Sequence, residues 1–213
     1  MTLLREGTAE DAGFHAQNIE AIGKQIRRWV DAGTPRTLVA LIARNGVIAL
    51  QEAAGPMTSE PDSPDVQLDS VFPASSLAKP ITAAAILMLV EDGLIGLNRP
   101  VREYIPEIAG VASDDLMLIH LLTHTSGYDE DKVGHMVTPR PKAPKDLPPP
   151  DSTLDPRLQR WLAARYPIAP LRPPGTLMEY CNYNYELLGE IVRRVSAMPF
   201  DSFVRERIFE PLG

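Results

Sequence analysis

Ser76 and Lys79 are the residues best placed to do chemistry, because they stand three positions apart in FPASSLAKPITAAAILMLV, residues 72–90. On a helix this spacing puts both side chains on one face. A serine hydroxyl is a weak nucleophile until a neighbouring base takes its proton. Burial and the positive end of a helix dipole would make the lysine ammonium acidic enough to serve. The Ser76 backbone N–H would then be an oxyanion donor.

A second candidate stretch is Tyr180-Cys181-Asn182, which stands directly before a predicted helix. A tyrosine beside an ammonium loses its proton more easily and can relay protons to a leaving group. The asparagine would orient an acyl amide or hold the lysine in place. Taken alone, each stretch also has a plain structural interpretation: a capping serine with a solvated lysine, and a turn with aromatic side chains in the core.

The two stretches together, with LLTHTSG and PPG…YxN…YELLGEI…IFEPLG, resemble the serine β-lactamase and penicillin-binding-protein superfamily. The resemblance is greatest to the class C-like branch, which includes family VIII esterases, D-aminopeptidases and D-alanyl-D-alanine carboxypeptidases. It covers residues 13–213. It implies an α+β fold in which an antiparallel sheet is flanked by helices and joined to a mostly helical lobe.

The resemblance also implies a role for each residue. Ser76 would be the acylated nucleophile and Lys79 its base or proton partner. Tyr180 would be the second acid/base group, and Asn182 would contact the substrate's acyl side chain. Cys181 departs from the usual serine, and we expect its side chain to point away from the site. The implied activity is hydrolysis of a small-molecule ester or amide through an acyl-enzyme, without a cofactor.

The superfamily's third motif, Lys-Thr-Gly or His/Trp-x-Gly on an inner strand, is absent from these residues. We therefore expect residues 1–213 to be one catalytic domain truncated before its C-terminal strands. The alternative is a non-catalytic fragment or subunit. The missing strands could be deleted, cut away or supplied by another chain, so self-association or a partner chain is one way to complete the sheet. An α/β-hydrolase is disfavoured, because there is no Gly-x-Ser-x-Gly elbow and no alternation of strands and helices.

The elements that would position these residues can be predicted from periodicity. Two β-rich runs, 37–44 and 47–52, flank Asn45-Gly46 and predict a hairpin with a type I′ turn. An amphipathic helix over 18–29 should pack on that sheet. Further helices are predicted at the positions 76–91, 114–126, 155–166, 182–196 and 200–213. The predicted sheet of two strands is too small to be stable alone.

The segment 138–174 differs in composition from the rest of the chain, because it holds eleven of the 21 prolines. Such a stretch cannot form a regular helix or sheet over most of its length. Because it leads into Tyr180, we interpret it as part of the cleft wall, with a solvated insert as the alternative.

Composition excludes several classes of function. The chain carries 21 Lys+Arg against 28 Asp+Glu, a net charge of −7, which disfavours nucleic acid and anionic membranes. The one cysteine allows no internal disulfide, and no signal peptide is visible, so we expect a cytoplasmic protein. His120 and His124 are four apart but lack the Glu of a His-Glu-x-x-His motif. We interpret His124 as structural, bonding around the Ser126-Gly127 turn, and expect no metal.

Overall fold

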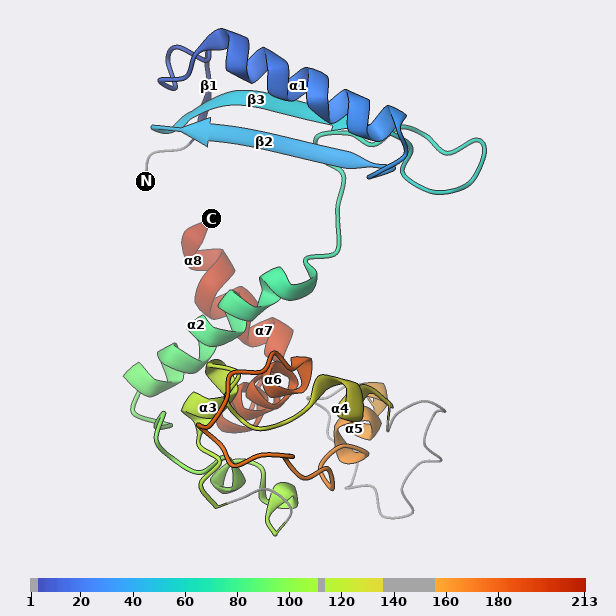
Figure 1. Ribbon diagram of the computed structural model, residues 1–213. Coiled ribbons are helices and arrows are strands. Elements are labelled where there is room, and N and C mark those ends of the chain that lie inside the picture. Colours follow the sequence, from blue (N-terminus) through green and yellow to red (C-terminus); the bar gives the residue numbers. More distant parts are fainter. Residues whose placement is uncertain (1–3, 111–113, 136–155) are drawn as a thin grey trace. The chain divides into compact units, whose positions relative to one another are not determined.

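A computed structural model describes residues 4–110, 114–135 and 156–213 (Figure 1). The chain divides into two compact units, Met1–Pro73 and Ala74–Gly213, and each is described here by itself. That both belong to one catalytic domain, as the sequence predicts, stays a prediction.

The first unit contains the predicted hairpin and helix. Its elements are β1 (Arg5–Glu6), α1 (Ala16–Asp31), β2 (Leu38–Arg44) and β3 (Val47–Ala54). Strands β2 and β3 are antiparallel, and the pairing runs from Leu38 opposite Ala54 to Arg44 opposite Val47. Asn45 and Gly46 both have positive φ, 54° and 76°. This is the backbone that a type I′ turn requires, so the predicted hairpin is confirmed.

The sheet has a third strand that the sequence reasoning missed. Strand β1 pairs in parallel with β3, with Arg5 opposite Val47, and the strand order is β1-β3-β2. Two residues are too few to show an alternating pattern. Their pairing depends on a strand about forty residues further along the chain.

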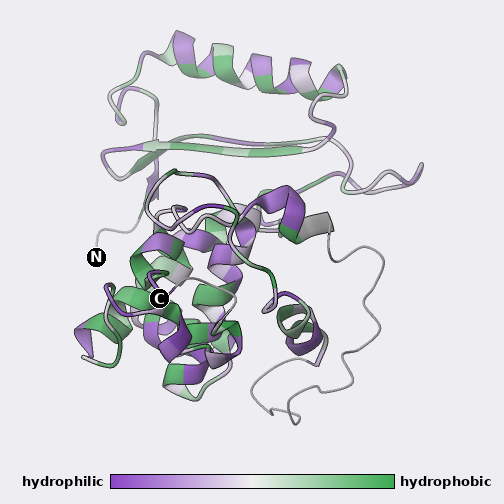
Figure 2. Ribbon diagram, turned by 60° about the horizontal axis from the view of Figure 1, so that its bottom comes forward, coloured by the Kyte–Doolittle hydropathy of each residue, from purple (hydrophilic) through white to green (hydrophobic). Residues whose placement is uncertain are grey.

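Helix α1 packs on β3, as predicted for an amphipathic helix (Figure 1). Its hydrophilic and hydrophobic residues alternate around the helix (Figure 2), and Ile19 and Ile26, seven residues apart, are buried. Gly23, which stands between them on the same face, is buried as well.

The second unit is helical in its described residues. Its main helices are α2 (Ala78–Glu91), α3 (Leu118–Leu122), α4 (Glu130–His135), α5 (Pro156–Ala163), α6 (Asn182–Ser196), α7 (Phe200–Val204) and α8 (Glu210–Leu212). A 3₁₀ turn, Ser75–Leu77, leads into α2, and two others cover Val101–Glu103 and Pro106–Ile108. The predicted helices at the positions of α2, α5 and α6 are confirmed.

Two helix predictions need correction. The helix expected from Asp114 to the Ser126-Gly127 turn is only the five residues of α3, because His124 adopts positive φ (56°) and the chain turns before Ser126. The final helix is divided by a π-helical turn over Arg205–Phe209. Helix α4 was not predicted. Most of the Pro-rich stretch, residues 136–155, lies outside the described residues.

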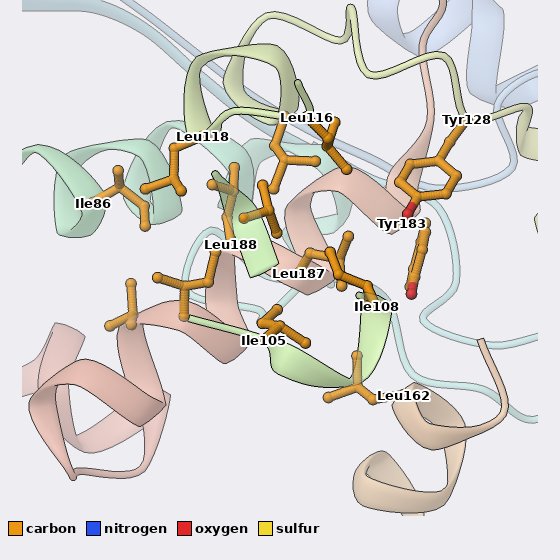
Figure 3. Close-up of a cluster of buried hydrophobic side chains, with 14 of the residues drawn as sticks. Ile86, Ile105, Ile108, Leu116, Leu118, Tyr128, Leu162, Tyr183, Leu187 and Leu188 are labelled. Atoms are coloured by element: carbon orange, nitrogen blue, oxygen red, sulfur yellow. The ribbon is translucent and has the colours of Figure 1, made fainter. Parts of the chain in front are cut away.

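The hydrophobic core of the second unit surrounds α6, which packs against α2, α3 and α7 (Figure 3). Leu187 and Leu188 of α6, Ile86 of α2 and Leu118 of α3 are fully buried in it. The start of α2 and the start of α6, where the candidate residues lie, are therefore held by one core. Among the described residues no helix is long and apolar enough to cross a membrane. The cytoplasmic location stays a prediction.

Candidate active site

Ser76 and Lys79 face each other at the start of α2. Ser76 lies in the 3₁₀ turn and is exposed, while Lys79 is half-buried in the first turn of the helix. The Lys79 Nζ donates a hydrogen bond of 3.1 Å to the Ser76 Oγ. The preceding residue, Ser75, has a φ of 47°, which non-glycine residues rarely adopt. Strained backbone of this kind is concentrated at functional sites.

Tyr180 and Asn182 reach the same place from the start of α6. The Tyr180 hydroxyl lies 2.7 Å from the Ser76 Oγ. The Asn182 Oδ1 accepts hydrogen bonds from Lys79 Nζ at 2.7 Å and from the Tyr180 hydroxyl at 3.1 Å. All four residues predicted from the sequence are therefore brought together, across about a hundred residues of chain. Their roles stay predictions.

The electrostatics of the site make Tyr180 easier to ionise than an ordinary tyrosine. The hydrogen bond with Lys79, followed by the one with Ser76, lowers the pKa of the Tyr180 phenol below its usual value. The Lys79 Nζ also lies 4.9 Å from the centre of the Tyr180 ring. A phenol with a lowered pKa, 2.7 Å from a serine hydroxyl, is suited to taking the serine's proton.

The Leu-Leu-Thr-His-Thr-Ser-Gly stretch positions Tyr180 through backbone hydrogen bonds. Carbonyl groups of His124, Thr125 and Gly127 accept from the amides of Glu179, Gly175 and Leu171, in that order. The approach is close at Gly127, where φ is 82° and a Cβ would clash with the Arg172 carbonyl. This explains why a glycine occupies that position. The loop holds the segment that ends in Tyr180.

His124 supports the same tyrosine with its ring. The imidazole stacks on Tyr180 with 4.6 Å between ring centres, and its Nδ1 accepts from the Cys181 amide at 3.2 Å. Burial, followed by the charge of Lys79, lowers the pKa of His124, so the ring is neutral at pH 7. His124 thus bonds to the Tyr180 segment, where the sequence reasoning expected it to bond around Ser126-Gly127.

His120 makes a separate contact, because its Nδ1 accepts from the Met117 amide at 3.1 Å. In the part of the chain that the structure describes, no three His, Cys, Asp or Glu side chains form a cluster suited to a metal ion.

Glu130, at the start of α4, is a member of the site that the sequence reasoning missed. Its carboxylate accepts one hydrogen bond of 2.6 Å from the backbone N–H of Asn182 and another of 2.7 Å from the side-chain Nδ2 of the same residue. Burial raises the pKa of this carboxyl, but the hydrogen bonds from Asn182 and Cys181 outweigh it and keep the pKa below the usual value. Within DEDK, residues 129–132, no local pattern distinguishes Glu130 from its acidic neighbours.

Cys181 stands between the two site residues and is fully buried. Burial raises the pKa of its thiol to about 12. The thiol is therefore protonated and unreactive in the folded chain. Its side chain is turned into the protein, against the Glu130 carboxylate.

Comparison with known proteins identifies the family. A model of the family described as Beta-lactamase matches residues 24–213. The chain belongs to the Beta-lactamase family. Esterase EstB of Burkholderia gladioli is 32% identical over 95% of this chain and 51% of its own length. The resemblance inferred from the sequence is thus confirmed.

Solved structures confirm the β-lactamase-like fold. A class C beta-lactamase matches with a TM-score of 0.70 and 20% identity, over 95% of this chain and 51% of its own. The hydrolase EstCE1 matches with a TM-score of 0.69 and 24% identity, over 93% and 51%. The chain spans about half the length of the relatives it matches.

Proposed function

We propose that this Beta-lactamase family protein is a serine hydrolase that acts on an ester or amide through an acyl-enzyme. One observation carries the proposal: the Ser76 Oγ lies within hydrogen-bond distance of both the Tyr180 hydroxyl and the Lys79 Nζ. A nucleophile in contact with two groups able to move its proton is the arrangement that covalent catalysis needs. The name of Esterase EstB, the 32% identical relative, supports an ester as substrate.

The proposed reaction has two steps. The Ser76 Oγ attacks the substrate carbonyl while its proton passes to Tyr180, and the Lys79 ammonium stabilises the phenolate that accepts it. Collapse of the tetrahedral intermediate breaks the ester or amide bond, and Tyr180 returns the proton to the departing alcohol or amine. A water molecule, deprotonated by the Tyr180 phenolate, then attacks the acyl-enzyme, and Tyr180 returns this proton to the Ser76 Oγ as the acid product leaves. The backbone N–H of Ser76 would donate to the oxyanion.

This scheme changes the balance of the roles implied by the resemblance. There Lys79 was the base or proton partner of Ser76, and Tyr180 was the second acid/base group, acting chiefly in proton transfer to the leaving group and in deacylation. The lowered pKa of Tyr180 and its 2.7 Å contact with Ser76 support Tyr180 as the direct acceptor of the serine proton. The position of Asn182 supports its holding Lys79, while its contact with the substrate stays a prediction.

The test is covalent labelling of the complete protein. A fluorophosphonate probe phosphonylates an activated serine, and intact-mass spectrometry counts the adducts. We expect one adduct in the wild type and none in Ser76→Ala, with the same circular dichroism spectrum for both. A folded wild type that forms no adduct would contradict the proposal and favour the non-catalytic alternative. An adduct that persists in Ser76→Ala would place the nucleophile elsewhere.

A further inference from the structure

Glu130 makes contacts that none of the roles assigned so far explains. Its two carboxylate oxygens accept from two different N–H groups of Asn182, one on the backbone and one on the side chain. Two donors of one residue thus converge on a half-buried carboxylate that stands 52 positions away in the chain.

These contacts decide which way the Asn182 side chain faces. An amide has an oxygen that only accepts and a nitrogen that only donates, while an ionised carboxylate only accepts. With Nδ2 bonded to Glu130, the Oδ1 must point to the other side, where Lys79 Nζ and the Tyr180 hydroxyl donate to it. The reversed amide would turn N–H groups toward the lysine ammonium and lose both of those bonds.

We propose that Glu130 is a positioning residue that fixes the orientation of the Asn182 amide and, through it, the placement of Lys79 and Tyr180 around Ser76. This inference rests on the proposed function, because it assigns Glu130 a role in that same reaction. Glu130 touches neither Ser76 nor the substrate in this scheme. Its effect passes through one side chain.

A simpler role for Glu130 would be structural only. Its bond to the Asn182 backbone N–H satisfies an otherwise unpaired donor at the start of α6, where a negative charge is favourable. It is not needed as a cap for its own helix, because Asp129 accepts from the Lys132 amide at 2.8 Å. The two roles make different predictions. Capping of α6 needs only the Asn182 backbone N–H, whereas fixing the orientation of the side-chain amide, called the amide lock below, requires the Asn182 side chain.

Glu130→Gln separates the two roles with least change in shape. A glutamine has one accepting oxygen, so it can serve only one of the two Asn182 donors and presents its own N–H groups to the other. Glu130→Asp keeps the charge on a shorter side chain and should restore part of the loss. Asp131→Asn, one residue further along α4, removes a carboxylate from an exposed position and is the matched control.

The kinetic test is a double-mutant cycle on the complete protein with a fluorophosphonate probe. We expect Glu130→Gln to slow phosphonylation of Ser76 by about 10–100-fold, since small misplacements in a site have effects of that size. Asp131→Asn should react as the wild type does. If the lock is real, Glu130→Gln combined with Asn182→Ala is no slower than Asn182→Ala alone. Rate losses that multiply would overturn the proposal, because Glu130 would then act without the Asn182 side chain.

A second measurement does not depend on the reactivity of Ser76. Selective ¹⁵N labelling of asparagine, with Asn182→Asp for assignment, reports the Asn182 side-chain amide by NMR. We expect its protons to exchange slowly with water in the wild type and in Asp131→Asn, and fast in Glu130→Gln. Slow exchange together with an unreactive Ser76 would remove the proposed hydrolase function while leaving the lock in place. Fast exchange in the wild type would refute the lock whatever Ser76 does.

Discussion

The two units of the chain differ in how much of themselves they bury. Helix α6 of the second unit has eight buried residues among fifteen, whereas β2 of the first unit has none and β3 has only Val47. Hydrophobic burial is the main stabilising term in folding. The helical unit therefore has a core of its own, while the sheet leaves most of its side chains half-buried or exposed.

The candidate site residues lie in the unit that has the larger hydrophobic core. Ser76, Lys79, Tyr180 and Asn182 all belong to the second unit, as do Glu130 and His124. A site that must hold a nucleophile within hydrogen-bond distance of two proton carriers needs rigid support. The well-packed unit supplies it. Completion of the sheet by further strands or by a partner chain stays a prediction.

Loss of the Lys79 amine is expected to have the largest effect. Lys79→Ala should slow phosphonylation of Ser76 by roughly 10²–10⁴-fold, the usual contribution of a proton-transfer group, measured with the fluorophosphonate probe. Lys24→Ala on α1, which removes a lysine from the first unit, is the control and should leave the rate unchanged. Equal rates for both variants would break the link between the second unit and the chemistry.

The same deletion at two leucines compares the packing of the units. Leu188→Ala in α6 removes a fully buried side chain and should lower the free energy of unfolding by about 2–5 kcal/mol in urea titrations. Leu41 in β2 is 53% exposed, so Leu41→Ala should cost about 1 kcal/mol at most. A larger loss at Leu41 would mean that something covers the sheet in solution.

Alanine substitution of two glycines, one in each unit, tests whether the reactivity of Ser76 depends on the second unit alone. At Gly127 and Gly55 φ is positive, and a Cβ would clash with a backbone carbonyl, of Arg172 and Arg36 respectively. Either alanine variant should lower stability by more than about 1 kcal/mol. Only Gly127→Ala should also slow Ser76 labelling, by about tenfold, because it displaces the segment leading to Tyr180. An equal loss of Ser76 labelling rate in Gly55→Ala would show that the reactivity of Ser76 depends on the first unit as well.

The smallest expected effect is a shift in pH dependence. Because the pKa of Tyr180 is lowered, its phenolate forms at lower pH than in an ordinary tyrosine, whose pKa is about 10. The labelling rate should therefore rise with pH and level off below that value. His124 does not contribute to this rise, since its lowered pKa leaves it neutral there. Tyr180→Phe should lose the rise; an unchanged profile would exclude Tyr180 as the proton acceptor.

Much of the fold and of the site could be predicted from local patterns. Asn45-Gly46 fixed the hairpin because few residue pairs accept two positive φ angles, and the apolar periodicity located α1, α2 and α6. The family resemblance joined Ser76-x-x-Lys79 to Tyr180-x-Asn182, and the structure brings them together.

What could not be predicted depends on distant partners. Strand β1 exists because β3 offers it hydrogen bonds, and α3 ends early because His124 turns to reach the Tyr180 segment. Glu130 stands among other acidic residues, and only its distance to Asn182 reveals a role. Each of these contacts joins residues more than forty positions apart, beyond the reach of a local pattern.

The burial of Cys181 gives the protein a built-in reporter of its own opening. It is the only cysteine of these 213 residues and is flanked on both sides by site residues. A thiol reagent can modify it only when the start of α6 detaches from the core. The rate of that modification thus measures local unfolding at the site, and it requires neither a substrate nor a mutation.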